Sequence, residues 1–113
     1  MRIEDYEFGR IVIDGKVYTD DVILIGDTVH PDWWRKRGHE LQPVDLKEVF
    51  NASVDLLIVG TGYYGRMSVP DSTREAIEEE GLNLIVEKTG DATQIYNEQQ
   101  SKDGVAAALH LSC

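Results

Sequence analysis

One stretch of this chain has the residue spacing of a dinucleotide-binding loop. Gly60-Thr61-Gly62-Tyr63-Tyr64-Gly65 follows the apolar run 56–59 and matches the pattern G-x-G-x-x-G. Glu87 ends the next apolar run, at the position expected of an acid that binds a ribose hydroxyl. In such a motif the glycines let backbone N–H groups approach a pyrophosphate at a helix N-terminus. Spacing alone would indicate a nicotinamide or flavin cofactor.

The residues that follow this motif argue against a bound dinucleotide. Pro70 and a predicted helix cap at Ser72 place the next helix several residues after the last glycine, so its dipole would miss the phosphates. The chain is also too short for two mononucleotide-binding halves. We therefore expect no cofactor. Either the glycines only permit a tight turn, or their amides form an anion-binding nest. The candidates for that pocket are Gly60, Thr61, Gly62, Arg66, Arg35 and His39.

The remaining groups with catalytic potential are scattered along the chain. His30, His39 and His110 lie in different segments, and none has metal-ligand spacing with the single Cys113. No Gly-x-Ser-x-Gly elbow is present. His110 lies in a run of small apolar residues, where a satisfied core or edge histidine competes with an acid–base role. The sequence thus predicts no metal site and identifies no catalytic residue.

Aromatic and basic side chains are concentrated in residues 30–41. This segment contains Trp33 and Trp34, followed by three consecutive basic residues that begin at Arg35. It has no sustained period and is interpreted as a loop pinned by its indoles. Its positive charge either focuses an anion or an acidic partner, or satisfies carboxylates of the same chain. Because exposed aromatic residues beside arginine are typical interface anchors, Trp33, Trp34 and Arg35 are the candidates for a partner interface.

Length and charge restrict the classes of protein to which the chain can belong. Its 113 residues are enough for one domain with its own core, and no apolar run approaches the ~18 residues that a membrane span requires. Eleven basic and twenty-one acidic residues give a net charge of -10, which disfavours nucleic acid and anionic lipid as partners. The first residues show no basic and apolar leader. We therefore expect a soluble cytoplasmic protein.

The order of apolar runs and turn residues predicts strands first and then strands alternating with helices. Asp14-Gly15 should form a type I′ turn between strands 8–13 and 16–19, which gives an N-terminal β-hairpin. Further strands are expected at 22–25, 56–59, 82–87 and 104–111, and helices at 43–50, 72–81 and 89–100. This order indicates one mixed α/β (α+β) domain over residues 1–113. A pocket is expected at the carboxyl end of the strand at 56–59.

Residues spread over nearly the whole chain resemble the Mth-type domain family of small uncharacterised proteins. The resembling positions are Phe8-Gly9, Ile11, Asp14-Gly15, Tyr18, Trp34-Arg35, Gly38-His39, Gly60-Thr61-Gly62, Val69-Pro70, Ser72-Thr73, Thr89, Tyr96-Asn97, Ala108-Leu109-His110 and Cys113. The family includes archaeal and bacterial members, the eukaryotic adipogenesis-associated domain protein and a mitochondrial complex I assembly factor. The order of these positions and the ending His-x-x-Cys carry the resemblance.

The resemblance implies a three-layer β+α/β/α fold around a mixed central sheet, and it implies no established catalytic activity. The chain departs from the family at Asp103-Gly104, where basic residues often stand before the last strand. The recurrent positions of the family fall here on Trp34, Arg35, Gly38, His39, Gly60, Gly62, Asn97, His110 and Cys113.

Two functional hypotheses follow from these observations. The leading one is a non-enzymatic binding or assembly module that contacts a protein partner, or a second copy of itself, through the tryptophan segment. The alternative is an enzyme that binds a small molecule or anion at the loop 60–65.

Overall fold

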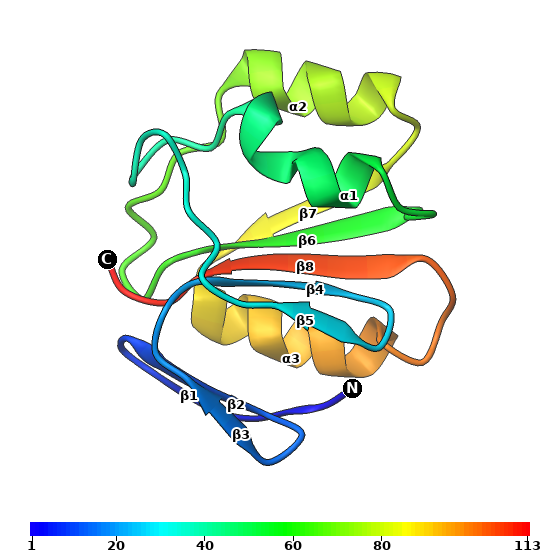
Figure 1. Cartoon of the computed structure of the whole chain (residues 1–113). Helices are drawn as coiled ribbons and strands as arrows, with labels where there is room; N and C mark the ends of the chain where they lie inside the picture. Colours follow the sequence, from blue (N-terminus) through cyan, green and yellow to red (C-terminus); the bar gives the residue numbers. More distant parts are fainter.

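The computed structural model describes residues 1–113 and places their strands in two sheets (Figure 1). The strands are β1 (Ile3–Glu7), β2 (Arg10–Ile13), β3 (Lys16–Tyr18), β4 (Val22–Ile25), β5 (Thr28–His30), β6 (Leu56–Thr61), β7 (Asn83–Glu87) and β8 (Val105–His110). The helices are a short 3-10 helix, η1 (Pro43–Leu46), and α1 (Lys47–Phe50), α2 (Asp71–Glu79) and α3 (Thr89–Gln99). None of them is long and apolar enough to cross a membrane.

The larger sheet is mixed and has the strand order β5-β4-β8-β6-β7. Strand β6 runs parallel to both β7 and β8, whereas β4 is antiparallel to β8 and to β5. All six residues of β8 are buried, because this strand lies in the middle of the sheet and is covered on both faces. The carboxyl ends of the parallel strands β6, β7 and β8 lie at the same end of the sheet, and the candidate site is located at this end.

Two hydrophobic cores cover the two faces of this sheet. On one face, η1, α1 and α2 pack over a core that includes Leu57, Val59 and Ile77. On the other face, α3 and the three-stranded sheet β1-β2-β3 enclose a core that includes Ile11 and Tyr96 (Figure 1). The arrangement is the predicted three-layer fold with a mixed central sheet, and the predicted fold class is confirmed.

The N-terminal hairpin forms as predicted, and a preceding strand was missed. Asp14 and Gly15 both have positive φ, 49° and 80°, as a type I′ turn requires, and Ile13 pairs with Lys16. The first residues, Ile3–Glu7, add β1 to the edge of this sheet. Their acidic side chains hid the strand pattern, because three of the five residues are Glu or Asp, which are depleted in strands.

The predicted capping box of the helix after Pro70 is wrong. Helix α2 begins at Asp71 rather than after Ser72, and its N-cap residue is Pro70, which makes no side-chain cap. The Thr73 hydroxyl instead donates a hydrogen bond of 2.8 Å to the Leu41 carbonyl and so ties the helix to the loop 31–42. This bond fixes the end of the loop that carries both tryptophans.

Candidate functional site

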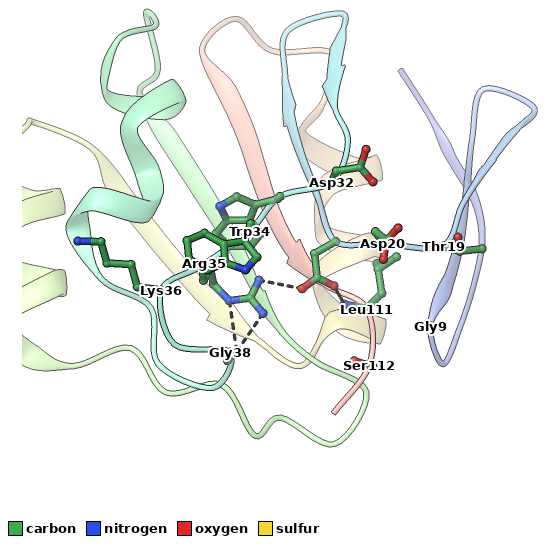
Figure 2. Close-up of a pocket in the computed structure, with 12 residues that line it drawn as sticks. Gly9, Thr19, Asp20, Asp32, Trp34, Arg35, Lys36, Gly38, Leu111 and Ser112 are labelled. Carbon is green, nitrogen blue, oxygen red and sulfur yellow. Dashed lines mark hydrogen bonds and ion pairs between the residues drawn. The ribbon is translucent and has the colours of Figure 1, made fainter.

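A surface hollow of about 630 Å³ lies where the chain leaves β8 and enters β4 (Figure 2). It is lined by Gly9, Thr19, Asp20, Asp21, Asp32, Trp33, Trp34, Arg35, Lys36, Gly38, Leu111 and Ser112. The predicted pocket was at the end of β6. The hollow is at the same end of the sheet but beside the neighbouring strand, β8, and residues 60–65 do not line it.

Asp21 is the centre of a buried polar network in the wall of this hollow. Its Oδ1 accepts the Leu111 N–H at 2.7 Å, and its Oδ2 accepts Arg35 Nη1 at 2.8 Å and lies 2.8 Å from His110 Nδ1. Burial opposes the charge of Asp21, but the bonds from His110, Leu111 and Arg35 outweigh it and hold the pKa of Asp21 below its ordinary value. The carboxylate is therefore ionised at neutral pH.

The network also places a proton on Nδ1 of His110. The Nε and Nη2 groups of Arg35 donate to the Gly38 carbonyl at 3.2 and 2.9 Å, as Figure 2 shows. Because an ionised carboxylate can only accept, the proton between His110 and Asp21 must be on Nδ1. The 3.0 Å approach of Arg35 Nη2 to the same Nδ1 is then a close contact and not a hydrogen bond.

The second ring nitrogen of His110, Nε2, is buried and has no hydrogen-bond partner. This is the single buried side-chain polar atom of the chain without a hydrogen bond. The ring of exposed His39 lies edge-on to the His110 ring, with centroids 5.9 Å apart. A buried polar atom without a partner costs free energy, so this nitrogen is the position in the network where a hydrogen-bond partner would stabilise the protein.

We expect nitrogen-15 spectra to show Nδ1 of His110 protonated at pH 7, because the ionised Asp21 carboxylate accepts the hydrogen bond of this nitrogen. Exposed His39 and half-buried His30, which lack a carboxylate partner, serve as internal controls and should show a mixture of tautomers. An unprotonated Nδ1 in His110 would contradict the assignment.

The two tryptophans have opposite environments. Trp33 is 9% exposed, its indole N–H donates to the Asp45 carbonyl at 2.9 Å, and the Arg35 guanidinium lies 4.6 Å from its ring centre. Trp34 is 77% exposed. The loop is thus pinned by one indole and not by both. Of the predicted interface residues, Trp33 and Arg35 are buried, and Trp34 alone presents its side chain to solvent.

The glycine loop uses its amides within the chain. The Gly62 N–H donates to Thr89 Oγ1 at 2.8 Å, and the N–H groups of Tyr63 and Arg66 donate to the carbonyls of Ser112 and Cys113 at 2.6 and 3.0 Å. An anion nest needs free amides, and these three are engaged. Of the two alternatives for the loop, the tight turn agrees with these bonds.

Some of the other predicted site residues belong to the Asp21 network, and the rest lie elsewhere in the fold. Arg35, His39 and His110 come together, and the Gly38 carbonyl completes the Arg35 contacts. Arg66 is exposed in the glycine loop, where its side chain forms no ion pair.

Two predicted residues lie outside the network, and one member of the network was missed. Asn97 is on α3, where its amide group bonds the N–H and carbonyl of Ile3 at 2.9 and 2.7 Å. Cys113 is a half-buried free thiol. Sequence reasoning missed Asp21 because no motif contains it. An acidic residue immediately before an apolar strand was the sole signal.

Comparisons with known proteins agree with the fold and the resemblance. The model of a family described as "Protein of unknown function (DUF498/DUF598)" matches residues 3–110. A conserved hypothetical protein from Pyrococcus horikoshii is 27% identical, with a TM-score of 0.86 and complete coverage of both chains. A protein from Rhodopseudomonas palustris is 28% identical, with a TM-score of 0.78 over 96% of this chain and 81% of that one.

A third structure supplies the name of the domain type. It is a Bordetella pertussis protein described as a Mth938-like domain, 16% identical, with a TM-score of 0.74 over 97% of this chain and 85% of that one. At this identity the likeness concerns the fold alone. Together with the match over residues 3–110, it confirms the resemblance to the Mth-type domain. The chain belongs to the DUF498/DUF598 family of proteins of unknown function.

Proposed function

We propose that the chain is a non-enzymatic binding or assembly module of the cytoplasm that docks a protein partner at the hollow, with Trp34 as its anchor. One observation carries this proposal. Trp34 is 77% exposed, yet both of its neighbours are buried and hydrogen-bonded. An indole that is exposed to solvent between two fixed neighbours has no evident role in the stability of the fold. It is suited to insert into a pocket of a partner protein.

The backbone around Trp34 is constrained on both sides. The Trp33 N–H donates to the Asp21 carbonyl at 2.8 Å, and the Arg35 side chain is clamped by Asp21 and Gly38. Since the backbone at Trp34 is already ordered, binding loses less conformational entropy there than a mobile loop would lose. Tryptophan is also the residue type most often found among energetically dominant interface positions.

Trp34 stands between two hollows, which gives a partner places to insert side chains on either side. The first is the hollow of about 630 Å³, and the second, of about 360 Å³, is lined by Trp34 together with Val44 and Glu48, among others. Val44 is also an exposed apolar residue. A ridge of exposed indole between two concavities is the geometry of an anchor rather than of an isolated surface residue.

We expect Trp34→Ala to abolish partner capture and to leave stability within about 0.5 kcal/mol of wild type, because the side chain removed is solvent-exposed. Tagged wild type, Trp34→Ala and Val17→Ala are compared in pull-downs with quantitative mass spectrometry. Val17 is the control because it is an exposed apolar residue on β3 that does not line the hollow. A partner captured equally by wild type and Trp34→Ala would refute the proposal. Self-capture lost in Trp34→Ala would identify the partner as a second copy.

A second candidate function, an enzyme acting on a small molecule, is favoured by the unpaired Nε2 of His110. A carboxylate that accepts the Nδ1–H of a histidine is an arrangement used in general-base catalysis, and here the buried Nε2 would have to become accessible to the substrate. A thermal-shift screen of phosphorylated metabolites and acyl carriers separates the two functions. A ligand at 100 times its dissociation constant stabilises by about 2.7 kcal/mol, and no shift with any of them would favour the binding module.

A further inference from the structure

Three exposed aromatic rings form a patch beside the tail that follows β8. Tyr64 is 62% exposed, Phe8 50% and Tyr63 48%. The ring centroids lie 5.9 Å apart for Phe8 and Tyr63, 5.9 Å for Phe8 and Tyr64, and 5.0 Å for Tyr63 and Tyr64. We call Phe8, Tyr63 and Tyr64 the aromatic patch. It does not line the hollow beside Trp34.

Backbone bonds to one short segment hold the aromatic patch in place. The Gly9 N–H, next to Phe8, donates to the Leu111 carbonyl at 2.9 Å, and the Tyr63 N–H donates to the Ser112 carbonyl at 2.6 Å. The Tyr6 hydroxyl adds a bond of 2.7 Å to the Leu111 carbonyl. The β1–β2 turn and the glycine loop are thus both attached to the same tail, so the rings are ordered before any partner arrives.

Two cations without acidic partners flank the patch. Arg66 follows Tyr64 by two residues, and a Cβ built on Gly65 would lie 3.2 Å from Cγ of Lys88, so the Lys88 side chain runs along the same turn. Neither cation has a carboxylate within 4.0 Å. The acidic residues before Phe8 face another cation, since Asp5 and Glu7 lie 3.1 and 4.0 Å from Arg10. In a chain with a net charge of -10, Arg66 and Lys88 are thus two cations of this turn that no carboxylate pairs with.

We propose that the aromatic patch, with Arg66 and Lys88, is a second docking surface that binds a partner segment carrying an apolar or aromatic side chain next to carboxylates. The rings supply apolar contact, and the two free cations select negative charge. The occupant is a segment of another protein. A symmetric dimer would bring the cations of both copies together, which opposes pairing through this surface. This surface is independent of Trp34.

The test uses fluorescein-labelled hexapeptides in polarisation titrations with the full chain. The probes are EEFLDE, its basic counterpart KKFLKK and its non-apolar counterpart EESGDE. We expect EEFLDE to bind at least tenfold more tightly than either counterpart and to weaken with added salt. Binding by KKFLKK as tight as by EEFLDE, or no binding of EEFLDE up to about 1 mM, would overturn the inference.

Matched variants locate the probe on the surface. Tyr64→Ser with Arg66→Ser should weaken EEFLDE binding about tenfold, because it removes one ring and one cation. Lys16→Ser with Val17→Ser removes an exposed cation and an exposed apolar side chain on β3 and should leave binding unchanged. Nitrogen-15 chemical shifts of the loop 62–66 should move in wild type when the peptide is added, and shifts confined to other segments would refute the site.

Two further arms separate this inference from its rivals. Trp34→Ala should bind EEFLDE as wild type does, and loss of binding in that variant would place the peptide in the hollow and overturn the second surface while leaving the proposed function intact. Vesicles containing phosphatidylserine should not compete with the peptide. Vesicles that bind the chain through Tyr64 and displace the peptide would show a lipid surface instead.

Discussion

Asp21→Ala should destabilise the folded chain by about 3–5 kcal/mol at pH 7, because it leaves the buried guanidinium of Arg35 without its counter-charge. The same substitution leaves the Leu111 N–H and His110 Nδ1–H without an acceptor. Urea unfolding at pH 7 measures the effect. The adjacent Asp20 is the matched control, since it is an exposed carboxylate without an ion pair and Asp20→Ala should change stability by less than about 0.5 kcal/mol.

The pH dependence of this difference has a definite sign. The folded-state pKa of Asp21 lies below its ordinary value of 3.8, so its contribution is complete above that pH and is lost as the pH falls through the folded-state pKa. The difference in stability between wild type and Asp21→Ala should therefore be constant near neutrality and shrink below pH 3.8. A difference that stays constant down to unfolding would mean that Asp21 acts by packing rather than by charge.

Elements whose signals are local were predicted from the sequence. The hairpin turn is encoded by two residues, Asp14 and Gly15, and the crossover from β6 through α2 to β7 by apolar runs on either side of an amphipathic segment. Strand β5 was missed because it has only three residues, one of them a half-buried histidine, His30. A strand this short gains its definition from pairing with β4, which no local window contains.

The Asp21 network could not be predicted from local sequence patterns, for the same reason. Asp21 and Arg35 are 14 residues apart, Asp21 and His110 are 89 apart, and no motif contains Asp21 or links it to the other two. What brings them together is the antiparallel pairing of β4 with β8, which sets Val22 opposite Leu109. For Arg35 the sequence left two alternatives, an exposed interface residue or a cation that satisfies a carboxylate of the same chain, and the ion pair of buried Arg35 with Asp21 agrees with the second.

The side chains of the tryptophan segment alternate between the interior and solvent. Trp33 is buried, Trp34 exposed and Arg35 buried, which is the alternation of an extended chain. In an extended chain, successive side chains point to opposite faces, so one of the two indoles is buried and the other is exposed. Sequence alone still leaves open which of the two faces inward, because the choice depends on the Asp45 carbonyl that receives the Trp33 N–H.

Gly62→Ala should destabilise the chain by about 3 kcal/mol or more, by combining a strained backbone with a collision. Gly62 has φ of 108°, and a Cβ at this position would collide with the backbone of Cys113 and lie 2.7 Å from the Ser112 carbonyl oxygen. These atoms are backbone and accept the N–H bonds of Tyr63 and Arg66, so moving them breaks the attachment of the tail. Urea and thermal unfolding measure the loss.

The collision can be separated from the strain with a second glycine. Gly81, after α2, also has positive φ, 83°, but a Cβ there would have no atom within 4 Å. Gly81→Ala should therefore cost only about 1–2 kcal/mol, the cost of the left-handed backbone. If both substitutions cost the same, the tail is not packed against the glycine loop as the structure has it. If Gly62→Ala costs more, the excess measures the contact that joins the loop, the tail and the aromatic patch.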